Sequence, residues 1–573
     1  MIETLRKCHR QRLEDFGLET LSQEVDRLRS NRKSNHHIIG SLRKAMLQTH
    51  RCPPEYIENA LWAYLSRYTS PKDTRDMSVS LTKVSLCNPR ISHRVGTSIP
   101  KRVKRAMRYL SSTSYSVNQR VAKVLRTRID NERLWDLVDN VGTRDYWMEA
   151  FADWRLRLYT DSQALLSFQG DDINRALTQF SKAMRVSKED LKVFLEIIED
   201  EYGLTIDKIR EIDRDPDGYL DNTEDRKPAC TMAAAFAYVE AEKTGYSRYI
   251  VQQDATCSGF QHISLLLRDR YLAKLVNVYP NRGKRRDLYK QVIRRLLNTS
   301  KKEWVKVLKE IPVHVLRADL AKDTVILTGY GSGDKPLALE FAGFSQPGDK
   351  LTYEEVIDMI LQGENIKLNP APCLRKILEG KNNIDTLKTC LDIAEELQKT
   401  LFAIAPTIKT FINALRGRAV SVYKKSDGKT TFKWTSPNGY QIDLLGYTPS
   451  KDHEVRTVCT TIDGDRKRIN ILKMVEGDCA SQAPPCVVHT WDAHVIHEMA
   501  IAGEENDIQL AMIHDSIGCH ICNVGWVQGT YSNTMIDAHE EEHLNNILLE
   551  NNGKPLTLGD LDIQECRASR MLY

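Results

Sequence analysis

The most constraining stretch of this sequence runs from Ile508 to Ile521, where two short apolar runs flank His514-Asp515-Ser516. Both runs are rich in strand-forming residues, so the pattern predicts a tight β-hairpin with Asp515 at its turn. A carboxylate left buried and unpaired between two apolar strands is strongly unfavourable. Asp515 therefore either reaches solvent as an ordinary turn residue or binds a metal ion, and the second alternative requires another carboxylate elsewhere in the chain.

A second carboxylate stands in a comparable place. Residues 249–253 have the pattern of a strand, Asp254 follows them, and a turn of small residues leads into a helix-like run from Phe260 to Asp269. This order puts Asp254 at the carboxyl end of a strand, where α/β sites tend to lie. Two aspartates on neighbouring strand ends could hold a pair of Mg²⁺ ions about 4 Å apart, the arrangement that serves phosphoryl transfer.

A third element adds a lysine and a tyrosine. Lys322, Ile326 and Tyr330 are spaced four apart, so they follow one face of a helix, and glycines come directly after them. An ammonium at one end and an aromatic ring at the other suit a nucleotide, with the ammonium on the phosphates and the ring under the base. The alternative is an amphipathic core helix that ends at Gly331.

Composition limits the class of protein. The chain has 573 residues, of which 41% are hydrophobic, which predicts three or four domains. It contains no run of eighteen apolar residues that could span a membrane. The N-terminal residues lack the apolar core of a signal peptide, and the thirteen cysteines are scattered. We therefore expect reduced thiols and a cytoplasmic location.

Charge is distributed unevenly. Residues 1–150 hold 28 Lys and Arg against 16 Asp and Glu, a net +12, so the remainder carries −7 of the overall +5. A long helix is predicted from Val117 to Ile129, with a basic polar face. This pattern suits an enzyme that binds a polyanion and does metal chemistry on it, and a solvated basic face is the alternative.

Two further motifs are weaker. His539–His543 matches the zinc-protease pattern HExxH, but it lies in an acidic segment, predicted to be a surface helix, with no evident third ligand. Cys519 and Cys522 form a single CxxC without a second pair, which favours buried thiols.

Taken together and in order, these elements resemble the single-subunit RNA polymerases of bacteriophages and mitochondria over roughly residues 114 to 530. The segments that carry the resemblance are Ser116–Val121, Asp153–Tyr159, Gln169–Asp172, Asp254–His262, Lys322–Ser332, Trp434–Gly439, Val488-His489 with Asp492, and His514–Ser516.

The resemblance implies roles for particular residues. Asp254 and Asp515 would bind both Mg²⁺ ions, with the backbone carbonyl of Ala255 completing one coordination sphere. Lys322 would bind the incoming triphosphate near the leaving group, and Tyr330 would stack on the nucleotide and favour ribose. The residues implied in binding substrate or nucleic acid are Arg157, Tyr159, Arg317, Gly331, His489 and His514.

Three features depart from the family's pattern. Four residues separate Arg317 from Lys322 where the family usually has three, so a regular α-helix would turn Arg317 about 140° away from Lys322. Alanine replaces the usual glycine at position 255, which keeps the carbonyl ligand. Only about 110 residues precede the thumb-like helix, where family members carry a large domain for promoter binding, so we expect an accessory protein for promoter recognition or melting.

We therefore expect an α+β right-hand polymerase with a small antiparallel palm sheet and mostly helical fingers and thumb. The predicted regions are a helical N-terminal region (1–70), a thumb-like basic region (71–143), a first palm segment (144–283), fingers (284–484, with a hairpin at 454–472) and a second palm segment (485–573). The expected reaction is DNA-templated transfer of NMP from NTP to an RNA 3′-hydroxyl, without membrane association. The alternatives are a DNA polymerase or primase with the same palm and an inactive nucleic-acid-binding subunit.

Overall fold

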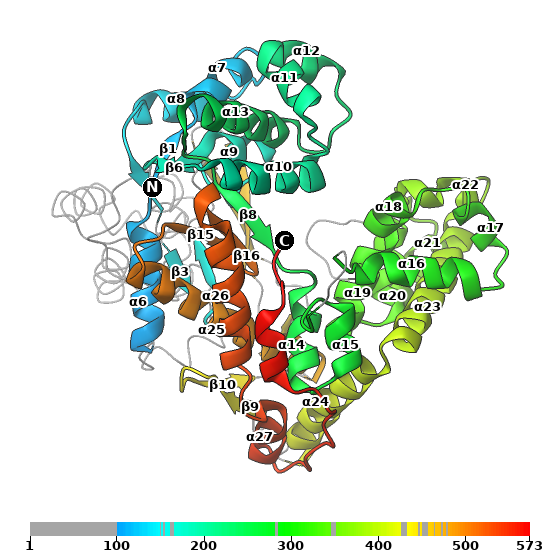
Figure 1. The fold of residues 1–573 in the computed structure, drawn as a ribbon. Helices are drawn as coiled ribbons and strands as arrows, with labels where there is room; N and C mark the ends of the chain where they lie inside the picture. Colours follow the sequence, from blue (N-terminus) through cyan, green and yellow to red (C-terminus); the bar gives the residue numbers. More distant parts are fainter. Residues whose placement is uncertain are drawn as a thin grey trace, which may run out of the picture.

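The computed structural model combines long helices with small antiparallel sheets (Figure 1). It describes residues 100–148, 150–152, 155–160, 166–280, 285–344, 351–425, 432–444, 447–449, 456–462, 465–471, 474–476 and 480–573. The mixture agrees with the α+β class expected from the sequence. The predicted helical region 1–70 and residues 71–99 of the thumb-like region lie outside the described residues, and the accessory protein stays a prediction.

The central sheet contains both of the predicted aspartate segments. Its strands are β8 (Val251–Asp254), β15 (Leu510–Ile513) and β16 (Ser516–Cys519), in the order β15-β16-β8, and both pairings are antiparallel. Helices α25 (Ala483–Glu505) and α26 (Val524–Asp537) pack against it. The hairpin predicted around Asp515 is therefore confirmed, and β8 lies beside it.

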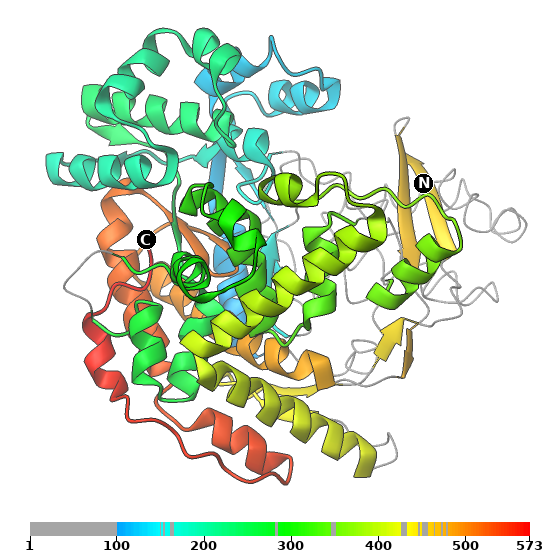
Figure 2. The same ribbon diagram turned by 90° about the vertical axis from the view of Figure 1, so that its right-hand side faces the viewer.

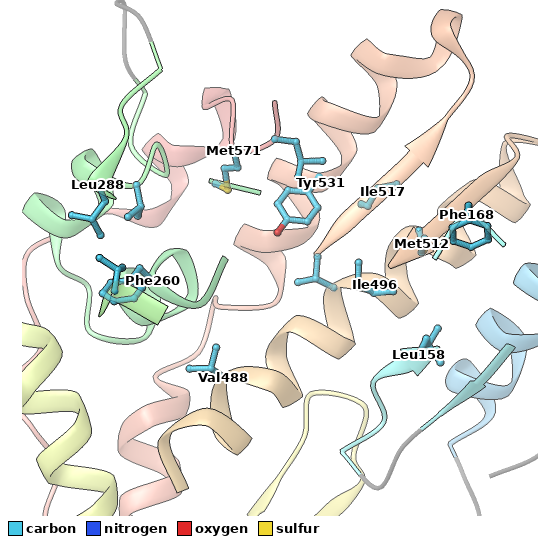
Figure 3. Packing of buried hydrophobic residues seen from close by; sticks show 14 of the residues in the cluster. Leu158, Phe168, Phe260, Leu288, Val488, Ile496, Met512, Ile517, Tyr531 and Met571 are labelled. Carbon is cyan, nitrogen blue, oxygen red and sulfur yellow. The ribbon is translucent and has the colours of Figure 1, made fainter. Parts of the chain in front are cut away.

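Apolar side chains of the sheet and its helices belong to one continuous core. Met512, Ile517, Ile496 and Tyr531 are all nearly completely buried, and Figure 3 shows them on the hairpin and on helices α25 and α26. Met571 belongs to the same core near the C-terminal end. The sheet is thus fixed by packing on its helices, which holds the hairpin turn and the end of β8 in place.

A second sheet replaces some of the long helix predicted from Val117 to Ile129. Strand β1 (Ser114–Val117) lies between β2 (Tyr146–Trp147) and β5 (Thr178–Phe180), and the helix α7 covers only Gln119–Leu125. The Asn118 side chain caps α7 by accepting from the amide of Val121, so the helix begins after the strand. Periodicity alone missed this change of structure.

The basic face of this region is largely neutralised within the protein. Arg120 pairs with Asp213, Arg126 with Asp139, and Arg128 with Asp217 and Asp221. The phosphate contact that the sequence suggested for this face therefore competes with internal carboxylates.

A helical arm lies on the right in Figure 1 and faces the viewer in Figure 2. It contains α16 (Leu288–Thr299), α19 (Lys322–Gly329), α20 (Asp334–Phe341) and α23 (Asn383–Ile404), and α20 and α16 both pack on α23. Helix α24 (Pro406–Lys425) leads back to α25. The hairpin predicted at 454–472 is present as β12 (Arg456–Ile462) and β13 (Asp465–Ile471), paired in register.

The other elements complete the chain. The helices are α6 (Lys101–Ser112), α8 (Glu132–Val141), α9 (Asp172–Leu177), α10 (Lys188–Tyr202), α11 (Ile206–Arg214), α12 (Pro216–Asn222), α13 (Pro228–Thr244), α14 (Ser258–Leu266), α15 (Arg270–Leu275), α17 (Trp304–Leu308), α18 (Val313–Leu316), α21 (Tyr353–Leu361), α22 (Arg375–Leu378) and α27 (His543–Glu550). The strands are β3 (Ala150–Ala152), β4 (Leu158–Thr160), β6 (Met184–Arg185), β7 (Tyr246–Ser247), β9 (Phe432–Thr435), β10 (Gln441–Leu444), β11 (Tyr447–Pro449) and β14 (Met474–Glu476). Across the ranges described, no helix is long and apolar enough to cross a membrane.

Candidate active site

The two aspartates lie at the same edge of the central sheet. In the register between β16 and β8, Ser516 stands opposite Asp254, and Asp515 directly precedes Ser516. The turn of the hairpin consists of His514 and Asp515 alone, with His514 at φ +52°, a backbone conformation that two-residue turns require. The strand pairing therefore brings the two carboxylates together although 261 positions separate them in the chain.

The surroundings of Asp515 disfavour its charged form. Burial raises the pKa of Asp515 to about 6, the negative charges of Asp492 and Asp254 add to this effect, and a hydrogen bond with Ser258 opposes it. The Asp254 carboxylate is exposed and makes no hydrogen bond or ion pair within the described residues. A cation bound between the two side chains would stabilise the charged form of Asp515 and would give the Asp254 carboxylate a partner.

The donor set suits Mg²⁺ better than zinc. Carboxylate and carbonyl oxygens are the ligands that Mg²⁺ prefers, and one or two carboxylates with water and phosphate oxygens are a usual complement. No group of three or more His, Cys, Asp or Glu in the described ranges is arranged to hold a metal, but an Mg²⁺ site of this kind needs only two. Residues Asp254, Asp515 and the carbonyl of Ala255 therefore fit the ion.

The backbone around Asp254 is held on both sides. Besides β16, the C-terminal residues pair with it: the Asp254 amide donates to the Tyr573 carbonyl over 2.9 Å, and the Tyr573 amide donates back over 3.0 Å. The end of the chain lies beside β8 in Figure 1. The Ala255 carbonyl accepts from the Cys257 amide at 3.0 Å, which leaves a second lone pair for a ligand.

Arg157 is held by a buried carboxylate. Its Nη2 donates to Asp492 Oδ2 over 3.1 Å, and both side chains are largely buried. The imidazole Nε2 of His262 lies 3.9 Å from the other oxygen of Asp492. Burial would raise the pKa of Asp492, but His262 and Arg157 outweigh it and hold that pKa below its ordinary value. Asp492 thus stays ionised close to Asp515.

Tyr330 and His489 meet at the same place. Their ring centroids are 5.1 Å apart, and His489 Nδ1 lies 3.0 Å from Arg155. Burial, together with the charges of Asp492 and Asp515, raises the pKa of the Tyr330 hydroxyl, and burial and the nearby arginines lower the pKa of His489. Both side chains are therefore neutral near pH 7, so they can exchange hydrogen bonds with a neutral ligand.

Tyr159 and His514 form a second ring contact, with centroids 4.8 Å apart in an edge-to-face arrangement. Strand β4 carries Tyr159 alongside β15. Gln169 reinforces the contact between these strands, because it accepts from the Thr160 amide and donates to the Met512 carbonyl. Asp153 and Trp154, which begin the segment of the resemblance that ends at Tyr159, lie outside the described residues.

Two glycines allow the Tyr330 helix to approach the helix after Asp254. A Cβ atom at Gly259 of α14 would lie 2.8 Å from the Tyr330 hydroxyl oxygen, and one at Gly329 would lie 2.4 Å from the ring of Phe260. These separations are shorter than real Cβ contacts. The close packing of α14 and α19 therefore depends on glycine at both positions.

Lys322 and Gly331 lie at opposite ends of this helix. Lys322 is exposed at the start of α19, roughly 12 Å along the axis from Tyr330. Gly331 has φ +83°, which glycine adopts without strain, and its carbonyl accepts from Arg416 of α24 over 3.0 Å. The end of the helix at glycine therefore also agrees with the alternative interpretation, an amphipathic core helix that ends at Gly331.

The predicted rotation of Arg317 away from Lys322 is wrong. Residues Arg317–Ala321 form a π-helical turn, in which the Lys322 amide bonds to the Arg317 carbonyl five residues back. Such a turn accommodates one extra residue, so Arg317 stands one turn before Lys322 and on the same side of the helix. Arg317 and Lys322 therefore lie on the same side of the helix despite the extra residue between them.

The HExxH segment is not the helix expected from the sequence. Helix α26 ends at Asp537 and α27 begins at His543, so the two histidines do not share a helical face. His539 is buried, where its Nδ1 donates to the Met535 carbonyl and its Nε2 faces His262 at 3.2 Å. His543 packs against Trp491. Among the described cysteines, Cys519 is buried and Cys522 half-buried, both as free thiols.

Several site residues were not singled out by sequence reasoning. Asp492 and His262 belonged to segments of the resemblance without an assigned role, whereas Asp287 and Tyr289 carried no signal that separates them from other polar or core residues. The pairing of residues 571–573 with residues 254–256 is also unpredictable, because an isolated bridge has no sequence pattern of its own.

Two carboxylates at neighbouring ends of an antiparallel sheet, beside a helix bearing a lysine and a tyrosine, are the arrangement of enzymes that transfer phosphoryl groups with two metal ions. A family model described as DNA-dependent RNA polymerase matches residues 204–555, more than half of the chain. The chain therefore belongs to the DNA-dependent RNA polymerase family, which confirms the resemblance seen in its sequence.

Individual relatives agree with this assignment. The chain is 24% identical to a probable DNA-directed RNA polymerase of Neurospora crassa, over 67% of this chain and 43% of the relative. It is 24% identical to the mitochondrial DNA-directed RNA polymerase of Schizosaccharomyces pombe over 63% of this chain and 30% of that protein. It is also 24% identical to the DNA-directed RNA polymerase of Pseudomonas phage phiKMV over 52% and 35%, respectively. The chain spans less than half the length of each of these relatives.

Proposed function

We propose that this chain is a DNA-dependent RNA polymerase, which adds NMP from an NTP to the 3′-hydroxyl of an RNA paired with a DNA template. The observation that carries the proposal is the meeting of Asp254 and Asp515 at one sheet edge, next to Tyr330 and His489. Family membership supports the same reaction.

In the proposed mechanism, Asp254, Asp515 and the Ala255 carbonyl hold Mg²⁺. When bound, Mg²⁺ lowers the pKa of the attacking hydroxyl and neutralises charge that develops on the phosphates. Lys322 binds the triphosphate and stabilises the departing pyrophosphate, because it is exposed and forms no hydrogen bond or ion pair with the described residues. Arg317, on the same side of the helix, adds a second cation.

Sugar and hybrid contacts come from the neighbouring side chains. Tyr330 stacks on the incoming nucleotide, and its neutral hydroxyl with neutral His489 recognises the ribose 2′-hydroxyl. Arg157 and Tyr159 face the RNA–DNA hybrid from β4 and the loop before it. His514 supports Tyr159, and Gly331 lets the backbone turn closely after Tyr330.

In this proposal, the regions of the fold correspond to the palm, fingers and thumb predicted from the sequence. The sheet β15-β16-β8 with its helices is the palm, and the arm that contains α16 to α23 forms the fingers. The thumb-like region includes α6 to α8, although its arginines are engaged by internal carboxylates. The partners are a DNA template, the RNA product and NTPs.

A DNA polymerase with the same palm is the second candidate function. It would need a site that excludes the 2′-hydroxyl, whereas Tyr330 and His489 offer two polar groups at this place. An inactive subunit is disfavoured by the retention of both aspartates, Lys322 and Tyr330.

The test is extension of an RNA primer on a DNA template with Mg²⁺, with NTPs and dNTPs compared. We expect templated extension with NTPs at least 10-fold faster than with dNTPs, in line with the cost of losing a polar contact in a site built for it. Preferential use of dNTPs would support the second candidate, and no extension with either would contradict both.

A further inference from the structure

A single π turn accommodates the extra residue between Arg317 and Lys322. Helix α18 runs into the π turn Arg317–Ala321, and α19 follows without a break, since the flanking residues Leu316 and Lys322 both have right-handed helical angles. A single π turn inside a continuous helix is equivalent to a one-residue insertion, and such turns are frequent at functional sites.

The Arg317 side chain is held by one edge only. Its Nε donates to Asp287 Oδ2 over 2.6 Å, and its guanidinium lies 5.1 Å from the centre of the Tyr289 ring. Within the described ranges, it makes no other hydrogen bond or ion pair, and the side chain is 30% exposed. The two terminal amino groups therefore have no hydrogen-bond partner among the described residues, and the edge of the guanidinium away from Asp287 is open.

Asp287 is itself fixed by the helix that it begins. Its second oxygen, Oδ1, accepts from the Lys290 amide over 2.9 Å and caps α16. Each carboxylate oxygen of Asp287 thus has a separate partner, one on α16 and one on the π turn. The residue cannot turn away from Arg317 without uncapping α16.

A chain of hydrogen bonds leads from Asp287 to the candidate metal site. The amide and carbonyl of the preceding residue, Arg286, both bond to the side chain of Asn277 at 2.9 Å. The Asn277 amide group also donates to Thr256 Oγ1 over 3.0 Å. Asn277 and Thr256 are buried, and Thr256 lies two residues after Asp254. Arg317 is therefore held relative to Asp254 by polar contacts in the protein interior.

We propose that Asp287 is a positioning residue for nucleotide binding: together with the π turn, it holds Arg317 beside Lys322, with the open edge of its guanidinium facing the phosphates of the incoming nucleotide. This inference rests on the proposed function, because it assigns the phosphate-binding side of that site. The alternative role for Asp287, neutralising the charge of Arg317, makes the opposite prediction. If Asp287 merely neutralised Arg317, its removal would strengthen phosphate binding.

The first experiment replaces Asp287→Asn. Asparagine still caps a helix, but its amide group cannot both cap α16 and accept from Arg317. We expect the KM for NTP to rise about tenfold with kcat changed less than threefold, since a charge-assisted hydrogen bond is lost before the chemical step. The matched control is Asp215→Asn, a capping aspartate at the start of α12 whose side chain, among the described residues, bonds only the Gly218 amide of that helix; the KM of this variant should not change. An unchanged or lower KM in Asp287→Asn would overturn the proposal.

The second experiment deletes Ala318. The deletion converts the π turn to a regular α-helix and keeps Arg317 one turn before Lys322, so the Tm should not fall and the KM for NTP should stay within twofold. Deleting Ala414, a partly buried alanine of the regular helix α24, should be damaging, because each residue removed from an α-helix turns the rest by about 100°. Equal tolerance of both deletions, or a large KM increase on deleting Ala318, would overturn the role of the π turn.

A binding measurement separates this inference from the proposed polymerase activity. Inorganic tripolyphosphate, titrated calorimetrically into the full chain, should bind the parent protein about tenfold more tightly than Asp287→Asn. Equal affinities would overturn the inference even if the parent extends primers. A parent that binds tripolyphosphate in the expected way but extends no primer would instead contradict the proposed function.

Discussion

The contact between Gly259 and Tyr330 gives a prediction whose size can be worked out from the structure. In Gly259→Ala the new methyl group would lie 2.8 Å from the Tyr330 hydroxyl oxygen and 3.2 and 3.3 Å from two ring carbons. Ordinary contacts begin near 3.4 Å, so the ring must shift by several tenths of an ångström. Overpacking of this kind costs about 1–3 kcal/mol, and the better helix propensity of alanine offsets about 1 kcal/mol of it.

The net effect on stability should therefore be small, while the effect on substrate choice should be clear. In the proposed site, the displaced hydroxyl would lose its contact to the ribose. A neutral hydrogen bond is worth about 0.5–1.5 kcal/mol, so the preference for NTP over dNTP should fall roughly two- to tenfold. The assay is single-nucleotide extension with each substrate, beside thermal unfolding.

The control is Gly525→Ala, at an exposed position of α26 where a Cβ meets nothing within 4 Å. It should raise stability by up to about 1 kcal/mol and leave substrate preference unchanged. If Gly259→Ala discriminates between NTP and dNTP as the parent does, Tyr330 does not read the sugar from its position beside Gly259.

Three further predictions concern the same site. Tyr330→Phe keeps the ring and removes the hydroxyl, so NTP use should survive while discrimination against dNTP falls; an unchanged rate ratio would argue against this role. Asp515→Asn should stabilise the metal-free protein above pH 6 by roughly 1–3 kcal/mol, because a raised carboxyl pKa makes the folded parent lose stability as pH rises from about 4 to 6. Urea unfolding at pH 4 and 7.5 tests this, and an equal gain at both would refute it. Asp492→Ala should destabilise the fold by about 3–5 kcal/mol, since it removes one partner of the buried ion pair with Arg157; a loss below about 1 kcal/mol in the same unfolding assay would show that the pair is dispensable.

Local patterns predicted the elements that form the candidate active site. The two apolar runs around Asp515 and the run before Asp254 have the residue patterns of strands. They can bury their apolar side chains by pairing in one sheet, as they do in the structure. The helix from Lys322 to Gly329 was predicted from its spacing in the same way. What each carboxylate faces, however, depends on the register between strands far apart in sequence.

The failures have the same origin. The extra residue before Lys322 was expected to rotate Arg317, because a constant helical period was assumed, and a π turn breaks that period locally. Val117 was placed in a helix because its spacing from Val121 suits one, although Asn118 caps a helix that begins after it. Asp492 is brought to Asp515, and His262 to Asp492, only by tertiary packing, which single-sequence patterns do not report.

The central claim is that Asp254 and Asp515 together hold the metal ions for RNA synthesis, and primer extension by Asp254→Asn and Asp515→Asn tests it most directly. Each substitution removes one ligand charge from an otherwise preserved sheet, so the variants should bind an RNA–DNA hybrid like the parent while templated NTP addition falls by at least 10³-fold, because the metal ions supply several kcal/mol of transition-state stabilisation. Substantial extension by either variant at ordinary Mg²⁺ concentrations would contradict the account.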